Sequence, residues 1–283
     1  MTATGRSSAE IVIAPDAETA ARIAAERIAA VLEAAVDGTG RADWATTGGS
    51  TPAGIYRRLA TVPLRDTVDW SRVHLWWGDD RFVPSDHPLS NVQAADEILI
   101  GRAGLSGESG IGEYAADITA GRDLGAPIPA LNVHPFPTTK AIGEGLGPDW
   151  CAQAYAEELR AAGPGARDGW PAFDLVLVGV GPDGHLLSVF PGSEALDRPE
   201  WALAIPAPSH VEPHVPRVTL NPAVLSVARV IVVVVSGDEK ATVVAQALEG
   251  EGDPHDLPAR LAAREGATWI LDKGAASALE TGR

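Results

Sequence analysis

Short apolar runs alternate with stretches of helical periodicity along the whole chain. The strongest runs, FDLVLV at 173–178 and RVIVVVV at 229–235, are almost continuously apolar, as is typical of parallel strands covered on both faces. Weaker strand patterns occur at 10–14, 44–47, 73–77, 132–136 and 268–271. The periodicity between them predicts a helix capped by Asp16 and ended by Asp37-Gly38, and further helices at 52–60, 91–100, 149–161 and 239–248.

This alternation predicts an α/β protein with a mostly parallel sheet and helices on both of its faces. No repeat is evident, and the loops at 101–112, 143–148 and 207–216 are not long or polar enough to be linkers. We therefore expect a single domain that spans residues 1–283. In such sheets ligands bind beyond the carboxyl ends of the strands, so the chemistry is expected in the segments that directly follow strands.

The charge balance narrows the class of partner. Lys plus Arg is 22 and Asp plus Glu is 38, so the net charge is −16. A general nucleic-acid binder needs a basic face that releases phosphate counterions, and this composition argues against one while leaving room for a small basic pocket. Lysine is rare, and occurs at Lys140, Lys240 and Lys273.

Cysteine usage and hydropathy point to a cytoplasmic protein. Cys151 is the single cysteine, which excludes a disulfide within the chain and a cysteine-based metal cluster. The longest apolar run, 230–235, is far shorter than the ~20 residues that span a bilayer. The first ten residues lack the basic and apolar pattern of a secretory signal. No membrane partner is expected.

The first candidate site is Thr47-Gly48-Gly49-Ser50-Thr51-Pro52, between a strand and a helix. Two glycines let backbone N–H groups approach a ligand, and a helix N-terminus flanked by hydroxyls favours a phosphate. The same residues also fit a plain turn in which Thr51 caps the helix.

A second candidate, Gly78-Asp79-Asp80-Arg81 with Ser90-Asn91 shortly after it, follows the next strand. Acids beside an arginine suit a polyhydroxylated or anionic ligand. The alternative is a solvated loop in which Arg81 neutralises the two acids.

The third candidate, Gly179-Val-Gly-Pro-Asp183-Gly-His185, follows FDLVLV. A histidine two residues from a carboxylate can act as a general base near neutral pH, although a histidine held by a backbone carbonyl is common. The segment also fits G-x-G-x-x-G. Because Pro191-Gly192 interrupts the helix that a dinucleotide site requires, no nicotinamide or flavin cofactor is expected.

The fourth candidate is Lys240 in Ser236-Gly237-Asp238-Glu239-Lys240, after the strongest strand. A compact ammonium group there suits a phosphate, and an exposed helix lysine is the alternative. Arg217 is a weaker basic candidate. His210 and His214 flank Pro213, which breaks the helix that would bring both imidazoles to one side, so no metal is expected.

Taken in order, TTGGSTP, WWGDDRFVPSDHPLSN, DLVLVGVGPDGHLLSVFPGS, and PRVTLN with SGDEK resemble the signatures of 6-phosphogluconolactonases. The resemblance implies a single-domain, Rossmann-like α/β fold shared with glucosamine-6-phosphate deaminases and ribose-5-phosphate isomerases. It implies hydrolysis of 6-phosphoglucono-δ-lactone to 6-phosphogluconate in the oxidative pentose phosphate pathway, without a cofactor. Two departures stand out: Asp80 where the family has Glu, and Leu186-Leu187 where it has Thr-Ala.

The resemblance also implies roles for the candidate residues. His185 would take a proton from the water that attacks the lactone carbonyl, Asp183 would orient its imidazole, and Arg81 would stabilise the oxyanion. The remaining residues would hold the sugar and its phosphate, with the phosphate on the glycine-rich loop and Lys240, assisted by Arg217. This binding set is Gly48, Gly49, Ser50, Thr51, Asp79, Asn91, Arg217 and Lys240.

Two rival functions fit the sequence less well. Glucosamine-6-phosphate deaminases continue the Asp-Gly-His motif with Phe-Asn-Glu-Pro-Gly, whereas this chain reads Val189-Phe190-Pro191-Gly192 without the glutamate. A non-catalytic sugar-phosphate sensor needs a DNA-binding module, and a strand, a helix and a strand occupy the residues before Thr47. The expected partner is therefore a small sugar-phosphate lactone.

Overall fold

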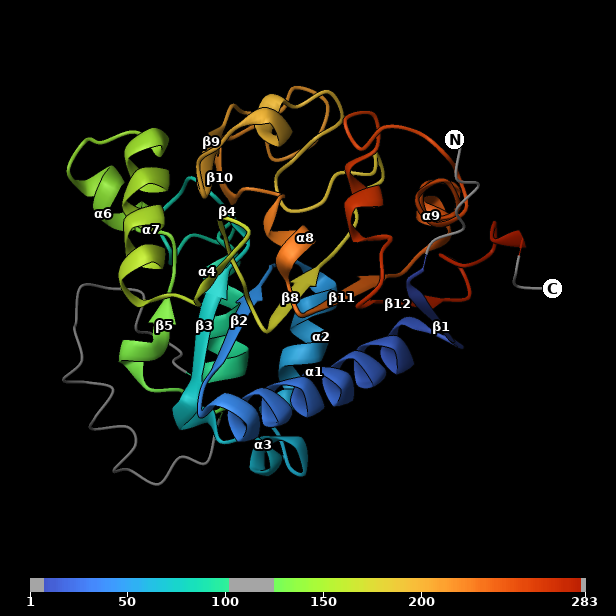
Figure 1. Ribbon diagram of the computed structural model, residues 1–283, viewed down its shortest axis with the longest axis horizontal. Coiled ribbons are helices and arrows are strands. Elements are labelled where there is room, and N and C mark those ends of the chain that lie inside the picture. Colours follow the sequence, from blue (N-terminus) through green and yellow to red (C-terminus); the bar gives the residue numbers. More distant parts are fainter. Residues whose placement is uncertain (1–7, 102–124, 281–283) are drawn as a thin grey trace.

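The computed structural model describes residues 8–101 and 125–280, and its centre is a seven-stranded sheet (Figure 1). The strand order is β1-β12-β11-β8-β2-β3-β5, and every pairing is parallel. The strands are β1 Glu10–Ala14, β2 Ala42–Thr46, β3 Val73–Trp77, β5 Val133–His134, β8 Leu175–Val178, β11 Val230–Val235 and β12 Ala267–Asp272. The predicted α/β class is confirmed, and each of the seven predicted strands is present.

Helices cover both faces of this sheet. The helix α1, Ala17–Thr39, crosses one face against β2, β8, β11 and β12 and packs beside α2, Ser50–Leu59. On the other face lies α7, Pro148–Ala162, whose Tyr155 meets Trp76 edge to face. The shorter helices are α3 Leu64–Thr67, α4 Asn91–Ala94, α6 Thr138–Gly143, α8 Val224–Val227 and α9 Ala241–Leu248. No helix among the described residues is both long and apolar enough to cross a bilayer.

Short 3-10 and π turns connect these elements. The 3-10 turns are η1 Trp70–Arg72, η3 Ala130–Asn132, η4 Glu194–Asp197, η5 Asp238–Lys240 and η6 Pro258–Ala262. The π turn η2, Ala95–Ile100, continues directly from α4. The predicted helix at 91–100 is therefore present as a helical segment that widens after its first turn.

The first helix begins as predicted and ends later than predicted. Asp16 accepts a hydrogen bond from the backbone N–H of Thr19 at 2.7 Å, which is the expected cap. The helix passes Asp37 and Gly38 and ends at Gly40, which has a left-handed φ of 77° and donates to the carbonyl of Val36. Glycine adopts this conformation without the penalty that a Cβ imposes, so the second glycine, and not the first, ends the helix.

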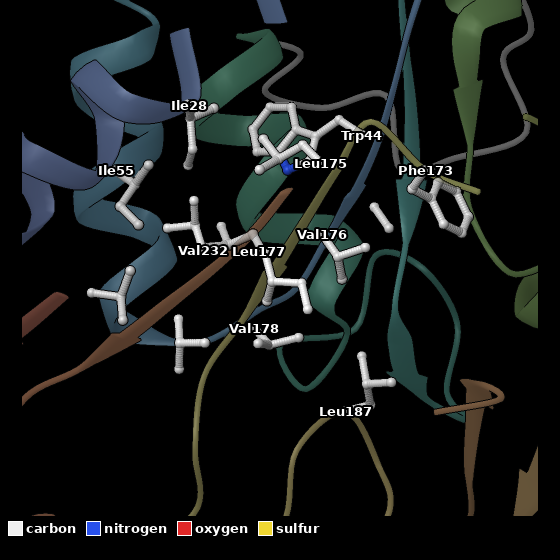
Figure 2. Close-up of a cluster of buried hydrophobic side chains, with 14 of the residues drawn as sticks. Ile28, Trp44, Ile55, Phe173, Leu175, Val176, Leu177, Val178, Leu187 and Val232 are labelled. Atoms are coloured by element: carbon white, nitrogen blue, oxygen red, sulfur yellow. The ribbon is translucent and has the colours of Figure 1, made fainter. Parts of the chain in front are cut away.

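The main core is one cluster of buried apolar side chains that is built around the central sheet. Figure 2 shows Ile28 of α1 and Ile55 of α2 facing Leu177 and Val232 of the central strands. Five tryptophans are fully buried: Trp44, Trp70, Trp76, Trp77 and Trp269. Burying each large apolar side chain contributes roughly 1.5–3 kcal/mol, so this core supplies the rigidity on which the strand ends depend.

A small antiparallel sheet stands at the carboxyl end of β3 and was not predicted. It consists of β4 Asp79–Arg81, β10 Arg217–Leu220 and β9 Ala202–Ile205. The alternative of a solvated loop at residues 79–81 is wrong, because β10 pairs with them from far along the sequence. A strand of three polar residues has no period to detect. A further hairpin joins β6 Ala166–Arg167 to β7 Trp170–Pro171.

Candidate active site

Four loops at the carboxyl edge of the sheet line one pocket of about 220 Å³. They follow β11, β8, β2 and β3, which are neighbours in that order, so strands about 4.8 Å apart place their loops side by side. The sequence-predicted residues that line the pocket are Gly48, Gly49, Thr51, Asp79, Arg81, Asn91, His185, Arg217 and Lys240. Asp183 lies behind His185. Ser50 begins α2, and its side chain is outside the described part of the chain.

The glycine-rich loop has no room for side chains at its first glycine. A Cβ on Gly48 would lie 2.0 Å from Oδ1 of Asn91, so only glycine lets the loop pass this close to α4. Gly49 has a φ of 108° and precedes the first turn of α2. The N–H groups of that turn have no partner within the helix, which makes its end a site for an anion.

Asp79 connects three of the loops. One of its carboxylate oxygens accepts from Ser188 Oγ at 2.6 Å, and the other accepts from Thr47 Oγ1 at 3.3 Å and from Asn91 Nδ2 at 3.4 Å. Asn91 Nδ2 also donates to the backbone carbonyl of Asp79 at 2.9 Å. Asp79 is buried, and these bonds fix the glycine-rich loop, the start of α4 and the segment after His185 relative to one another.

Asp80 faces the opposite side of β4 and serves the fold. Its carboxylate accepts from the backbone N–H groups of Arg81 and Asn91 and from Ser90 Oγ, at 2.7 to 2.9 Å. Complete burial raises the pKa of Asp80 to about 7, against the lowering effect of these donors. The carboxyl group therefore anchors the turn that leads into α4.

Two arginines from adjacent strands enter the pocket together. Arg81 of β4 and Arg217 of β10 are direct partners in the antiparallel register. Burial lowers the pKa of Arg217, and the positive charge of Arg81 lowers it further. Within residues 8–101 and 125–280, Nε of each arginine is buried without a hydrogen-bond partner. Two desolvated cations this close favour a bound anion between or beside them.

His185 and Asp183 form a hydrogen-bonded pair at the pocket wall. Nδ1 of His185 lies 2.5 Å from Oδ1 of Asp183, which also accepts from the backbone N–H of His185 at 3.1 Å. Burial raises the pKa of Asp183, but the hydrogen bond from the His185 side chain and the other donors outweigh it and hold the pKa well below its usual range. The carboxylate thus fixes the proton on Nδ1. In the described part of the chain Nε2 has no hydrogen-bond partner and is the nitrogen free to accept a proton.

The ring of His185 has a prepared place. A Cβ on Gly181 would lie 2.1 Å from Cε1 and Nδ1 of His185, so the imidazole rests directly on the backbone of that glycine. The ring of Phe190 also packs against it, tilted by 46° and with ring centroids 4.7 Å apart. His185 is 16% exposed, which leaves it accessible from the pocket and otherwise enclosed.

Lys240 closes the side of the pocket that faces α2. It is the last residue of η5 and the residue before α9, and it lines the pocket together with Thr51. The lysine, the helix N-terminus and the two arginines give the pocket a positive lining in a protein whose net charge is −16. The geometry thus combines an anion site with a free imidazole nitrogen.

Two neighbours of the site had no role predicted from the sequence: Leu187, noted only as a departure from the family pattern, and Ser188. Leu187 lines the pocket with a left-handed φ of 53°, and its Cδ2 would lie 2.7 Å from a Cβ on Gly78. Ser188 is completely buried and bonds to Asp79. The signal for Ser188 was a single hydroxyl within the apolar run Leu186–Phe190, which requires a buried polar partner.

The two histidines of the 207–216 loop do not converge. His214 Nδ1 lies 2.8 Å from the carbonyl of Pro208, whereas His210 Nε2 lies 3.1 Å from Oδ2 of Asp183. No group of three or more His, Cys, Asp or Glu residues that could hold a metal ion occurs within 8–101 and 125–280. His210 thus belongs to the surroundings of the Asp183–His185 pair.

Comparisons with known proteins place this geometry in a family. The sequence model of the family described as glucosamine-6-phosphate isomerases/6-phosphogluconolactonase matches residues 15–270. The chain is 32% identical over 271 residues to the 6-phosphogluconolactonase of Streptomyces coelicolor, covering 95% of this chain and 94% of the relative. A solved 6-phosphogluconolactonase from Trypanosoma cruzi has a TM-score of 0.79 at 25% identity, covering 99% and 100% of the two chains. A monomeric glucosamine-6-phosphate deaminase shares the fold alone, with a TM-score of 0.71 at 18% identity and coverage of 95% and 99%.

Proposed function

The chain belongs to the family of glucosamine-6-phosphate isomerases and 6-phosphogluconolactonases, and we infer that it is an enzyme that hydrolyses 6-phosphoglucono-δ-lactone to 6-phosphogluconate. This reaction is the hydrolytic step of the oxidative pentose phosphate pathway. One observation carries the inference for this chain. The imidazole of His185, whose Nδ1 is held by Asp183, lines the same small pocket as the positively charged residues that can bind an anion.

The anion site is proposed to hold the 6-phosphate. The N-terminus of α2 presents backbone N–H groups after Gly49, Lys240 lies beside it, and Arg217 supplies a buried guanidinium. A sugar phosphate carries about −1.5 to −2 charges at neutral pH. Three cationic elements in one pocket balance that charge, and they fix the far end of the substrate so that its reacting end is oriented.

His185 is proposed as the general base. Its Nδ1 proton is held by Asp183, so Nε2 removes a proton from a water molecule as the water oxygen bonds to the lactone carbonyl carbon. Arg81 stabilises the negative charge that develops on the carbonyl oxygen. When the intermediate collapses, the bond from that carbon to the ring oxygen breaks, and the protonated imidazole can return its proton to the departing oxygen. The product is the open-chain acid.

The rival deaminase reaction lacks one group in this chain. Deaminases of this fold continue the Asp-Gly-His motif with a glutamate, and the corresponding stretch here is Val189-Phe190-Pro191-Gly192. Val189 is completely buried and Phe190 nearly so, and they pack against Ala195, Leu203 and Ile205. An apolar cluster at that position supports the lactonase and supplies no second carboxylate.

A coupled assay tests the proposal directly. The lactone is generated immediately before use, and 6-phosphogluconate dehydrogenase reports the product as NADPH. Addition of the purified protein should raise the rate well above spontaneous ring opening, whereas release of ammonia from glucosamine 6-phosphate should stay at background. Acceleration of ammonia release without lactone hydrolysis would replace this function with the deaminase.

A further inference from the structure

Asp183 is shared by two imidazoles. Its Oδ1 bonds to Nδ1 of His185 at 2.5 Å, and its Oδ2 bonds to Nε2 of His210 at 3.1 Å. The carboxylate is 20% exposed, so both bonds form in a partly desolvated setting. A carboxylate accepts only through its oxygens, so His210 donates a proton from Nε2 when Asp183 is ionised.

The position of His210 is defined by more than this one bond. Its ring meets Phe190 edge to face with centroids 5.6 Å apart, and the same Phe190 contacts His185 and lies under the guanidinium of Arg217. The loop around His210 is held by His214, whose Nδ1 lies 2.8 Å from the carbonyl of Pro208. The two imidazoles are thus linked through one carboxylate and through one aromatic ring.

A second donor changes what the carboxylate does to the base. A carboxylate beside an imidazole stabilises the protonated ring, and a base that stays protonated cannot accept a proton from water. A hydrogen bond to the other oxygen draws negative charge away from His185 and weakens this stabilisation. The sign is the same whether His210 is neutral or protonated, because both forms can donate from Nε2.

Other charged groups near Asp183 come from three further segments and are left unchanged by a substitution at position 210. Arg217 of β10 lies over Phe190 and interacts electrostatically with Asp183. Asp183 also lines a second hollow, together with charged residues of η5 and of 250–260: Glu239, Glu251, Asp256 and Arg260.

We propose that His210 is a positioning residue for the hydrolysis: by holding Oδ2 of Asp183 it fixes the rotation of the carboxylate and draws negative charge away from the oxygen that faces His185. This inference rests on the proposed function of His185 as general base. The His210 ring itself does not line the pocket and is not placed against the substrate.

The test compares His210→Phe and His210→Ala, which remove the donor, with His210→Gln, which keeps an N–H at a similar distance from the backbone. His210 is 54% exposed, so these substitutions leave the core intact. In the Phe and Ala variants the acidic midpoint of the kcat/KM profile should move up by about half a pH unit, a roughly threefold loss of activity on the acidic side. KM at high pH should stay within about twofold, and the Gln variant should follow the wild type.

A second measurement separates this inference from the proposed function. The ring resonances of His185, identified by their absence in His185→Ala, are titrated by NMR without substrate. The midpoint should rise in the Phe and Ala variants and stay near the wild-type value in the Gln variant. A wild type without lactonase activity would overturn the proposed function, whereas an active wild type whose midpoints are unmoved in both donor-free variants would overturn the role of His210.

Discussion

His185 and His255 show that an Asp-x-His pattern does not by itself identify a catalytic histidine. Asp253-Pro254-His255 repeats the local geometry of Asp183-Gly184-His185: in each, Oδ1 of the aspartate accepts from the backbone N–H of the histidine and bonds to its Nδ1. Nε2 of His255 is engaged by Asp197 at 3.2 Å, and the residue lies outside the pocket. Nε2 of His185 has no hydrogen-bond partner among residues 8–101 and 125–280 and lies in the pocket, and that difference makes His185 a candidate base.

The first prediction uses this pair. His185→Ala should lower kcat by about 10² to 10⁴, because general base catalysis contributes on that scale. The melting temperature should change little, since the ring rests at the pocket wall and outside the apolar core. His255→Ala is the matched control and should retain wild-type turnover. Near-normal lactone hydrolysis by the His185 variant would remove the base from the mechanism.

Asp80 gives a prediction for pH and stability. An aspartate carboxyl ionises near 3.8 in the unfolded chain, and burial raises the pKa of Asp80 to about 7 in the folded protein. Between these pH values the folded protein binds a proton that the unfolded chain has released. The contribution of Asp80 to the free energy of unfolding should therefore fall as the pH rises from about 4 to 7.

The Asp80→Asn variant tests this window by urea unfolding at pH 5, 6, 7 and 8. Because the amide cannot ionise, the stability of the variant relative to wild type should increase with pH across the series. Asp86→Asn, at an exposed position, is the control and should leave the pH dependence unchanged. Parallel stability curves for wild type and the Asp80 variant would contradict the buried, proton-binding carboxyl.

At the scale of elements, the site depends on how closely a loop and a helix approach. The glycine-rich loop and the start of α4 meet where Gly48 faces Asn91. Lys240, at the end of η5, lines the same pocket. These contacts join segments that are distant in sequence, so the position of each depends on the other's side chains.

Gly48→Ala should damage the loop. The added Cβ would lie 2.0 Å from Oδ1 of Asn91, and relief requires the loop or α4 to move, at a cost of about 1–3 kcal/mol in stability. KM should rise as the anion site distorts. Gly143→Ala in α6 is the matched control, because its Cβ would meet nothing within 4 Å. Unchanged KM and stability in the Gly48 variant would mean that this approach is not required.

Lys240→Ala tests the phosphate end of the pocket. A lost charge-assisted contact is worth about 1.5–3 kcal/mol, so KM should rise by about 10- to 100-fold while kcat changes less. Lys140→Ala is the control, since Lys140 stacks over Trp150 and is not part of the pocket. An unaltered KM for the Lys240 variant would count against phosphate binding at this residue.

At the scale of the whole molecule, strand order makes the pocket. The strands β11, β8, β2 and β3 are adjacent, although they lie far apart in sequence and out of sequence order. Their parallel directions bring the four loops to one edge, and the small antiparallel sheet adds Arg81 and Arg217 from the side. The main apolar core reaches the small sheet through Ala202, Val218 and Leu220, and a second, smaller cluster includes Leu203 and Ile205 of β9.

This core predicts cooperative unfolding. Tryptophan fluorescence, which reports eight indoles of which five are fully buried, and far-ultraviolet circular dichroism should follow the same urea transition. Coincident transitions are expected if residues 1–283 form one domain. That domain extent stays a prediction. Two resolved transitions would instead divide the chain into independently folding parts.

The sequence by itself determined the elements and the type of chemistry that follows them. The strands at 10–14 and 73–77 were predicted to the residue, because apolar runs bounded by turn residues have a local cause. The candidate groups were found for a similar reason: histidine, lysine and paired glycines directly after buried strands are visible in the chain. Local patterns were insufficient at the end of α1. Gly38 and Gly40 both fit a helix end in the sequence, and Gly40 is the one that caps the helix in the left-handed conformation.

Tertiary structure decided everything that depends on a partner distant in sequence. It made residues 79–81 a strand, joined three loops through Asp79 and its bond from Ser188, and brought His210 to Asp183. It also distinguished His185 from His255, which have the same local pattern. The physical reason is that desolvation, free nitrogen atoms and close backbone approach arise only when segments far apart in the chain pack together.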